Sequence, residues 1–462
     1  MRILVAIANY GDENRSYVER LIREYQDMPW NVDIVILSEK QKVFDSDVEV
    51  RVGLPSPDPW SLPFAHKRLF AERSRVYDLY IYSEDDTLIT ESHVTAFLNA
   101  TRTIPAPRIV GFLRYEEGSD GKKYCSTAHS HFHWRPGSVE HFGDHTVAEF
   151  SNAHSAAFML TRNQLNRAIA SGGFVVPPHN EFYDLPCTAA TDPYTQCGMR
   201  KVICVSHMDS FLLHHMPNKY VGRLGMPLEE FVLQIPALTA LSAACVGELF
   251  PIEKSHVPAS YSKSYYESAE PKLVEAIPSE TRVFSVGAGT GALERALIEK
   301  GCDVSALSLD PVISSLAERS GVPMVERTSS DLHALVKSAT RRLRPDRVVL
   351  ANVLQHVEDP AGFIRAVSTE LPPQAEIVGT VPNFGRVRRA QMRRRIETLG
   401  YRQSKLQAVT PTSLRSWCKA AGLKTRLGAI PDPRRSRTLK RFCDIYPKLL
   451  GDVLLFRLTR SS

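Results

Sequence analysis

Three carboxylates follow one another directly after an apolar run in the N-terminal part of the sequence. Residues 79–82 form that run, and Glu84, Asp85 and Asp86 come just after it. Adjacent carboxylates repel one another, so grouping them is unfavourable unless a cation offsets the charge. A hard divalent ion held by one or two carboxylates normally completes its shell with substrate phosphates. The triplet therefore predicts a metal–diphosphate site, with an exposed acidic turn as the competing interpretation.

A glycine loop is the second chemical signal. Residues 283–286 are apolar apart from Ser285 and typical of a strand, and Gly287, Gly289 and Gly291 follow before a helical segment. Glycines let the backbone turn tightly and approach a ligand closely. A strand, a loop and a helix in this order are the context that such a motif requires, although the spacing does not separate a dinucleotide from other adenosine ligands.

Both motifs depend on strands and helices that alternate along the chain. In the first half, apolar runs predict strands at residues 3–8, 32–37 and 79–82, with helices at 17–25 and 66–76. Alternation of this kind favours a parallel α/β sheet, and ligands of open α/β sheets bind at the carboxyl ends of strands.

The remaining sequence divides the chain. Residues 115–155 are polar and rich in His and Gly, and we interpret them as loops around a site. A linker-like stretch at 252–264 precedes a fresh α/β series. The sequence therefore predicts two α/β domains, residues 1–255 and 256–462.

The composition is that of a globular protein. Of 462 residues, 43% are hydrophobic and 23% charged, which excludes disorder as the main state. No apolar run is long enough for a membrane-spanning helix, and the N-terminus is predicted to be a first strand and not a signal peptide. The eight cysteines lack a CxxC pair, so we expect reduced thiols and a cytoplasmic protein.

The net charge of +6 is mild and gives no reason to expect a nucleic-acid partner. The basic excess is local, in clusters at 386–395 and 434–441. These clusters are either solvated surface or a contact for an acidic acceptor or the inner face of an anionic membrane.

The order of elements around Glu84-Asp85-Asp86 resembles glycosyltransferases of the GT-A fold, over roughly residues 1–250. An acidic triplet ending a central strand is their mark, and it holds Mn²⁺ or Mg²⁺ on the diphosphate of a nucleotide-sugar donor. The resemblance implies that Asp86 is a metal ligand and that Glu84 or Asp85 contacts the ribose or metal-bound water. It also implies several further donor and metal contacts: Ala8 and Asn9 at the base, Glu39 assisting, Lys67 in the helix that precedes the acidic strand, and His214 and His215 as late metal ligands.

An inverting transfer needs a carboxylate that deprotonates the acceptor hydroxyl. We favour Asp184 over Glu181, with Asp192 third; a retaining enzyme would not need this base in the same role. A zinc site on the histidines of this half has no HExxH motif or cysteine pair behind it, and acceptor-binding loops or surface are favoured instead. Those histidines are His129, His131, His133, His141, His145 and His154.

The C-terminal half resembles class I S-adenosyl-L-methionine-dependent methyltransferases, with a Rossmann-like fold over about residues 260–462. The motifs that carry this resemblance are Tyr265-Tyr266-Glu267, the glycine loop, residues 349–360, residues 381–383 and residues 410–423. The resemblance implies that the cofactor is bound by the loop glycines together with Asp310, Asp331 and Asn352. It also places His356 near the transferred methyl group, as a proton acceptor or as a packing residue.

Two positions depart from this family pattern. The family commonly has an acidic residue two positions before the first glycine, where this chain has Ser285, and another at the end of the second strand, where it has Ser308. Ribose hydroxyls would lose strong acceptors without these carboxylates. Asp310 is the candidate replacement at the second position.

Our hypothesis is a bifunctional enzyme that transfers a sugar through its N-terminal domain and methylates a hydroxyl of a glycan or lipid-linked, possibly anionic, acceptor through its C-terminal domain. Three alternatives remain open. The protein could be a methyltransferase whose N-terminal domain only binds the acceptor. It could be a glycosyltransferase whose C-terminal domain is degenerate, structural and binds no cofactor. It could also be a non-enzymatic scaffold with salt-sensitive binding to an acidic partner.

Overall fold

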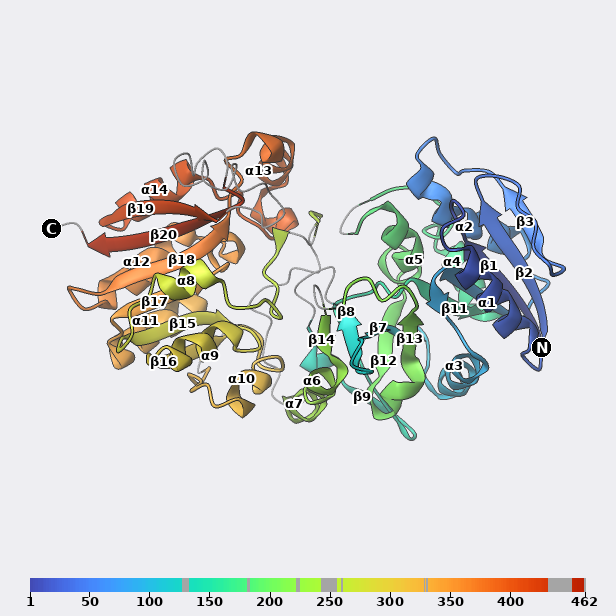
Figure 1. Ribbon diagram of the computed structural model, residues 1–462, viewed down its shortest axis with the longest axis horizontal. Helices are drawn as coiled ribbons and strands as arrows, with labels where there is room; N and C mark the ends of the chain where they lie inside the picture. The colour runs from blue at the N-terminus through green and yellow to red at the C-terminus, as the bar shows by residue number, and fades with distance from the viewer. Residues whose placement is uncertain are drawn as a thin grey trace. The chain divides into compact units, whose positions relative to one another are not determined.

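The computed structural model describes residues 1–126, 133–180, 183–221, 225–241, 256–258, 261–327, 329, 331–430 and 451–460. The chain divides into two compact units, Met1–Ala244 and Cys245–Ser462 (Figure 1). The sequence analysis put the division near residue 255, and the passage between the units lies within 242–255, outside the described residues. Each unit is an α/β assembly, with three sheets described in the first unit and one in the second.

The first unit is built on a five-stranded sheet whose order is β11-β4-β1-β2-β3. Four of its strands are parallel, and β11 runs antiparallel to β4. The bounds are β1 Arg2–Ala8, β2 Asn31–Ser38, β3 Glu49–Val52, β4 Leu79–Glu84 and β11 Ala157–Thr161. Six of the seven residues of β1 are buried, as expected of a strand covered on both faces. Helices accompany this sheet: α1 Arg15–Gln26, α2 Ala65–Glu72, α3 Glu91–Thr103 and α4 Arg162–Ala170, with the 3₁₀ helix η1 Pro59–Phe64 before α2.

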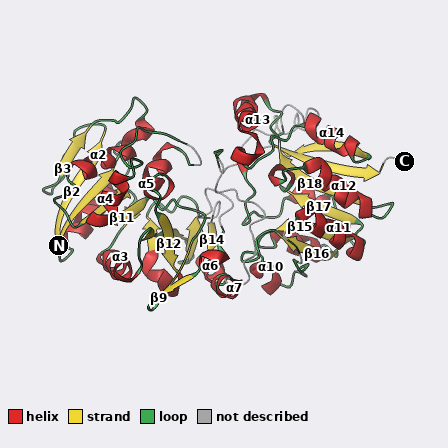
Figure 2. Ribbon diagram, turned by 180° about the vertical axis from the view of Figure 1, so that it is seen from behind, coloured by secondary structure: helices red, strands yellow, loops and turns green. Residues whose placement is uncertain are grey.

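Short strands form two further sheets in this unit (Figure 2). One has the order β6-β12-β10-β9, with bounds Arg108–Val110, Arg200–Cys204, His145–Ala148 and Glu140–Phe142. The other has the order β14-β8-β7-β13-β5, with bounds Gly225–Pro227, Lys123–Ser126, Leu113–Glu117, Leu212–His215 and Thr87–Leu88. The helices here are α5 Leu185–Thr195, α6 Leu228–Val232 and α7 Ile235–Leu241, with 3₁₀ helices η2 Pro136–Ser138 and η3 Val205–Phe211. Within 115–155 the prediction of loops was therefore incomplete, because strands of three to five residues are too short to show a period.

The second unit holds a six-stranded sheet of order β16-β15-β17-β18-β20-β19. The bounds are β15 Arg282–Ala288, β16 Asp303–Ser308, β17 Arg347–Ala351, β18 Glu376–Pro382, β19 Leu423–Ile430 and β20 Val453–Arg460. Strands β15 to β18 are parallel and β20 is antiparallel to both neighbours. The helices are α8 Pro271–Glu275, α9 Ala292–Glu299, α10 Ser315–Arg319, α11 Leu332–Leu343, α12 Pro360–Glu370, α13 Ala390–Ser404 and α14 Pro411–Ala420, with 3₁₀ helices η6 Leu354–His356 and η7 Val387–Arg389. The strand and helix that flank the glycine loop are present as predicted.

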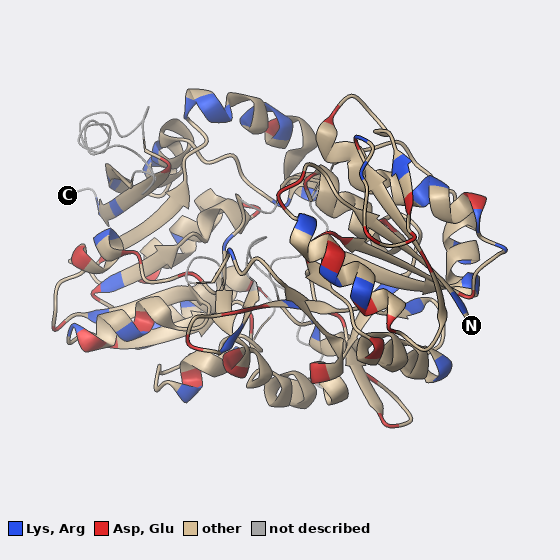
Figure 3. Ribbon diagram, turned by 45° about the vertical axis from the view of Figure 1, so that its right-hand side comes forward, with Lys and Arg blue, Asp and Glu red and all other residues tan. Residues whose placement is uncertain are grey.

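Part of the first arginine cluster faces the interior. Arg386 is buried and forms an ion pair with Asp452, and the Arg389 guanidinium lies 5.4 Å from the ring centroid of Tyr261. Across both units, basic and acidic residues are interspersed on the helices (Figure 3). The second cluster, 434–441, is outside the described residues. Within the described chain, every helix is too short or too polar to cross a membrane.

Candidate functional sites

The acidic triplet lies where β4 turns into β5. Glu84 is the last residue of β4, and Asp85 and Asp86 form the turn. Strand β5 pairs antiparallel with β13, which sets Thr87 opposite His215. The Asp86 carbonyl also accepts a hydrogen bond from the Met216 backbone N–H. These contacts hold the end of β13 beside the triplet.

Asp86, His215 and Glu116 form a buried chain of polar contacts. His215 Nε2 lies 3.2 Å from Asp86 Oδ2, and its Nδ1 lies 2.5 Å from Glu116 Oε1. Glu116 Oε2 is in turn held by the backbone N–H groups of Tyr220 and Val221. Burial works against the imidazolium, but the two carboxylates outweigh it and raise the pKa of His215. A carboxylate behind one ring nitrogen fixes the orientation of a histidine, as it does for histidines that bind metals.

The other two carboxylates, Glu84 and Asp85, have raised pKa values. Burial, and then the charge of Asp86, raises the pKa of Glu84 to about 7 and that of Asp85 to about 6. Asp85 accepts hydrogen bonds from the side-chain amides of Asn9, at 2.6 Å, and Asn14, at 2.8 Å. Asp184 lies near enough to raise the pKa of Glu84 further. A concentration of buried carboxyl groups with this many shifted pKa values is typical of a functional site.

The loop after β1 is fixed by a lysine that the sequence analysis did not single out. Lys42 Nζ donates to Asn9 Oδ1 at 2.6 Å, to the Asn9 carbonyl at 3.0 Å and to the Gly11 carbonyl at 2.5 Å. Glu39, at the end of β2, accepts from the Gly11 backbone N–H. The structure thus brings Asn9, Glu39 and Asp85 into one network, next to Ala8 at the end of β1.

Two cations stand beside the triplet. Burial raises the pKa of Asp86, but the hydrogen bond and charge of His215 lower it, and the charges of Lys219 and Arg114 lower it further. Lys219 and Arg114 also lie over the ring of Tyr220, at 5.3 and 5.6 Å respectively from its centroid. Nothing in the sequence indicated them, because an arginine in a five-residue strand and a lysine in a turn are ordinary surface features.

Several predicted residues lie elsewhere. His214 points away from the triplet, since neighbouring strand residues alternate in direction; its Nε2 contacts Asn218 and its ring stacks on Tyr115. Glu181 lies outside the described residues, as do His129 and His131. Asp184 caps the N-terminus of α5, accepting from the Cys187 backbone N–H at 3.2 Å.

Lys67 is buried in an ion pair with Asp192, which also contacts His179. Asp192 is completely buried, which does not fit a base that must reach an acceptor hydroxyl. Lys67 borders a cavity of about 410 Å³ at the carboxyl end of β3. If Lys67 contacts the donor as predicted, the donor must enter this cavity.

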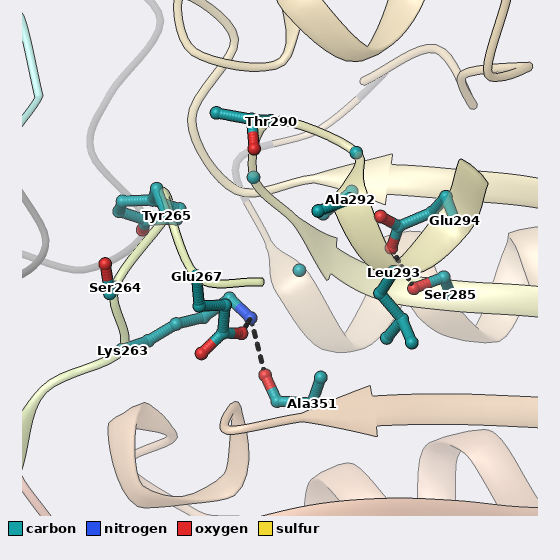
Figure 4. Close-up of a pocket in the computed structure, with 14 residues that line it drawn as sticks. Lys263, Ser264, Tyr265, Glu267, Ser285, Thr290, Ala292, Leu293, Glu294 and Ala351 are labelled. Atoms are coloured by element: carbon teal, nitrogen blue, oxygen red, sulfur yellow. Dashed lines mark hydrogen bonds and ion pairs between the residues drawn. The ribbon is translucent and has the colours of Figure 1, made fainter. Parts of the chain in front are cut away.

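The glycine loop of the second unit is closely packed. Gly287 and Gly291 have φ of +93° and +83°, a region that favours glycine. A Cβ on Gly289 would lie 2.1 Å from the Tyr265 carbonyl oxygen, so only glycine fits under that backbone. Gly291 is the N-cap of α9, and the helix N-terminus offers free N–H groups to a ligand. Together with Lys263, Ser264, Tyr265 and Glu267 the loop lines a pocket (Figure 4).

A buried carboxylate enters this pocket from the helix. Ser285 Oγ donates a 2.6 Å hydrogen bond to Glu294 Oε1, and both residues line the pocket (Figure 4). On the opposite side Lys263 Nζ donates to Glu267 at 2.7 Å and to the Ala351 carbonyl at 2.6 Å. The sequence analysis noted the serine at 285 but missed both Glu294 and Lys263.

Comparison with known proteins finds a family match for the second unit. Residues 259–427 match the family model described as "Methyltransferase domain". These residues form a class I S-adenosylmethionine-dependent methyltransferase domain. The chain is 28% identical over 172 residues to a ubiquinone biosynthesis O-methyltransferase of Xanthomonas axonopodis pv. citri (strain 306), covering 35% of this chain and 70% of that protein.

Solved methyltransferases are similar to about two fifths of the chain. One from Archaeoglobus fulgidus is 14% identical, with a TM-score of 0.31, covering 41% of this chain and 90% of that one. One from Mesorhizobium loti is 18% identical, with a TM-score of 0.32, covering 41% and 96%.

Two acidic residues predicted to bind the cofactor have local structural roles in the methyltransferase domain. Asp331 is exposed and caps α11, accepting from the backbone N–H groups of His333 and Ala334. Asp310 Oδ1 accepts from those of Val312 and Ile313, both at 2.9 Å. Ser308 does not replace a carboxylate, because its hydroxyl donates to the Asp310 carbonyl.

Asn352 comes directly after Ala351, which lines the pocket. It follows β17 in a left-handed conformation, with φ of +55°, and its side-chain N–H donates to Glu267 at 3.2 Å. Its Oδ1 is buried and, among the described residues, accepts no hydrogen bond. An unfilled buried acceptor is costly, and a bound ligand that donates would satisfy it.

The structure does not support His356 as a proton acceptor for the reaction. Its Nε2 accepts the backbone N–H of Lys263 at 2.9 Å, and the side chain is completely buried. Burial, helped by the Lys263 charge, lowers the pKa of His356 to about 3. The residue is therefore neutral at physiological pH and holds the 263 segment against the strand ends, which was the alternative interpretation.

Proposed function

We propose that the methyltransferase domain transfers the methyl group of S-adenosyl-L-methionine to a hydroxyl oxygen of a glycan or glycosylated acceptor. A new C–O bond forms as the C–S bond breaks, the hydroxyl proton leaves to solvent, and S-adenosylhomocysteine remains. The observation that carries this proposal is the glycine loop packed beneath Tyr265, with Glu294 in the same pocket. The similarity to an O-methyltransferase supports oxygen as the acceptor atom.

The residues of the pocket, together with Asn352 next to the pocket-lining Ala351, fit this cofactor. The loop glycines would let the cofactor approach the backbone closely. Asn352 Oδ1 is a buried acceptor without a donor in the described structure, and Glu294 offers the carboxylate that Ser285 lacks. When bound, the cofactor supplies the activated methyl group on its sulfonium. With His356 held neutral and occupied, the chain's own contribution is to hold the acceptor oxygen in line with that methyl group.

We propose further that the first unit transfers a sugar from a nucleotide sugar with Mn²⁺ or Mg²⁺. The supporting observation is the contact between Asp86 and His215. Two ligands held at right angles about 2.1 Å from an ion stand about 3.0 Å apart. The Asp86 and His215 atoms are 3.2 Å apart, so an ion that displaces the proton of His215 Nε2 would fit the pair.

The surroundings of this pair favour a diphosphate as the third partner. Arg114 and Lys219 add positive charge beside Asp86. Asp184 is the candidate base for an inverting transfer, because it lies near Glu84 and is exposed. The nucleobase and ribose of the donor would bind at the network of Asn9 and Glu39.

A thermal-shift experiment on the full chain tests both proposals. UDP, GDP and dTDP are each added with Mn²⁺, and S-adenosylhomocysteine is added separately, because ligands of the folded state raise the melting temperature. We expect one nucleotide with Mn²⁺ to stabilise the wild type but not Asp86→Asn, and S-adenosylhomocysteine to stabilise both proteins.

Each result has a definite meaning. If no nucleotide acts, sugar transfer is refuted and a first unit that only binds the acceptor is favoured. If S-adenosylhomocysteine has no effect, the second domain is degenerate and the methylation proposal fails. Two activity assays then follow. Release of sugar from the donor tests sugar transfer, and transfer of a labelled methyl group from the cofactor to the sugar product tests whether that product is the methyl acceptor.

A further inference from the structure

Two histidines and a cysteine meet at one end of the short sheet that contains β10 and β12. His145 begins β10, Cys204 ends β12, and His207 lies in η3. One ligand atom of each lies within 4.8 Å of the other two. Cys204 and His207 are 3 residues apart in the sequence, but His145 is 59 residues before Cys204, so no local motif contains all three. The acidic triplet contributes no residue to this cluster.

The distances suit a tetrahedral ion. Zinc bound to sulfur at about 2.3 Å and to nitrogen at about 2.0–2.1 Å places these two ligands about 3.6 Å apart. Cys204 Sγ lies 3.7 Å from His207 Nδ1. The rings of His145 and His207 have centroids 5.3 Å apart and are tilted, so they are neighbours without being stacked.

A carboxylate supports one of the histidines from behind. Asp144 Oδ1 lies 2.9 Å from His145 Nδ1, which leaves Nε2 as the ligand nitrogen. A carboxylate that engages the second nitrogen of a histidine is the usual outer partner of a zinc ligand. The charges also balance, since a thiolate and a carboxylate together neutralise a divalent ion.

We propose that His145, Cys204 and His207 bind a zinc ion, with a water molecule as the fourth ligand. The alternative is a hydrogen-bonded cluster without an ion, in which Ser206 Oγ contacts His207 Nδ1 at 2.9 Å and Cys204 Sγ at 3.5 Å. An ion takes the place of these two contacts. Ser206 keeps its other bonds, to the Thr146 backbone N–H at 3.0 Å and the Asp144 carbonyl at 3.3 Å.

The site is structural in this proposal. It ties the end of β12 to the start of β10 and to η3, whose backbone departs from helical geometry at His207. Cys204 is fully buried, whereas His207 is exposed, so the ion would enter from the His207 side. Binding requires the thiolate and therefore releases the cysteine proton.

Cobalt titration of the full chain tests the proposal. Co²⁺ replaces zinc and gives a near-ultraviolet charge-transfer absorption only when a thiolate is a ligand. The proposed Asp86 site has no sulfur, so its success or failure does not affect this signal. His207→Ala is the main variant because its exposed side chain can be removed without disturbing the core.

We expect one cobalt–thiolate equivalent per wild-type chain, displaced by Zn²⁺. His207→Ala should weaken the apparent affinity at least about 100-fold, and Asp144→Asn about 10- to 100-fold, as is usual for outer partners. His141→Ala is the matched control, since His141 is exposed on the adjacent strand β9 and is outside the cluster; it should bind like the wild type. Absence of the absorption in the wild type, or an absorption that His207→Ala leaves unchanged, overturns the proposal.

Discussion

The replacement of Glu294 by glutamine tests whether the helix supplies the carboxylate that the glycine loop lacks. The change keeps the size and hydrogen-bonding shape of the side chain and removes its charge. Glu294 is buried, lines the pocket beside the glycine loop and accepts a 2.6 Å hydrogen bond from Ser285. If the Glu294 charge contacts the cofactor, the replacement weakens cofactor binding. If Glu294 contacts only Ser285, the replacement changes the stability of the protein but not its affinity for the cofactor.

The expected size follows from the type of interaction. A hydrogen bond to a charged group contributes about 1.5–3 kcal/mol, against about 0.5–1.5 kcal/mol between neutral groups. S-adenosylhomocysteine carries an ammonium and several hydroxyls that can donate to a carboxylate. Loss of one charged bond of about 1.5–3 kcal/mol corresponds to roughly 10- to 150-fold weaker binding, at about 1.4 kcal/mol per factor of ten.

Calorimetric titration of the full chain with S-adenosylhomocysteine measures this effect. Glu299→Gln is the matched control, because Glu299 is exposed at the other end of the same helix, and it should bind normally. Ser285→Ala should have a smaller effect than Glu294→Gln, since it leaves the carboxylate in place. A folded Glu294→Gln protein with unchanged affinity would refute the reasoning and reduce the Ser285–Glu294 contact to a core hydrogen bond.

Three other changes have definite expectations. Gly289→Ala should abolish S-adenosylhomocysteine binding in the same titration, because the new Cβ would lie 2.1 Å from the Tyr265 carbonyl; normal affinity would contradict the tight packing. His356 has a pKa of about 3 when folded and 6.5 as its ordinary value, so below pH 6.5 the unfolded state takes up a proton that the folded state does not, and stability falls. His356→Gln should therefore reduce the loss of unfolding free energy between pH 7 and pH 5 by about 2 kcal/mol in urea titrations, and an unchanged pH dependence would exclude the neutral buried form. Asp192→Asn should destabilise the first unit by about 3–5 kcal/mol in the same assay, because Lys67 would be left buried without its anion, whereas replacing both residues with apolar ones should cost much less.

The sequence allowed the positions of both motifs to be predicted. A strand buried on both faces is a continuous apolar run, so β1, β4 and β15 are visible locally, and the acidic triplet and the glycine loop are located by the ends of these strands. The methyltransferase fold could be expected because several of its motifs occur in order, and the family match agrees with that expectation. The short strands within 115–155 were missed, because a run of a few residues has no measurable period.

The partners of the motif residues were decided by the tertiary structure. His215 meets Asp86 across 129 residues and Glu116 across 99, and Lys67 meets Asp192 across 125. A pattern of residue types does not show which strands pair or which way a side chain points. If the pairing of β13 were shifted by one residue, His214 would face the triplet in place of His215. The zinc ligands proposed here depend on the same pairing.

The amino-acid sequence by itself thus determined which segments are buried strands and where charge and glycine stand at their ends, because burial and backbone freedom are properties of a few neighbouring residues. Whether a histidine is a base or a packing residue depends on what surrounds its two nitrogens. Burial and the Lys263 charge lower the pKa of His356, whereas two carboxylates raise the pKa of His215 against the effect of burial. Those surroundings come from distant segments, and only folding brings them together.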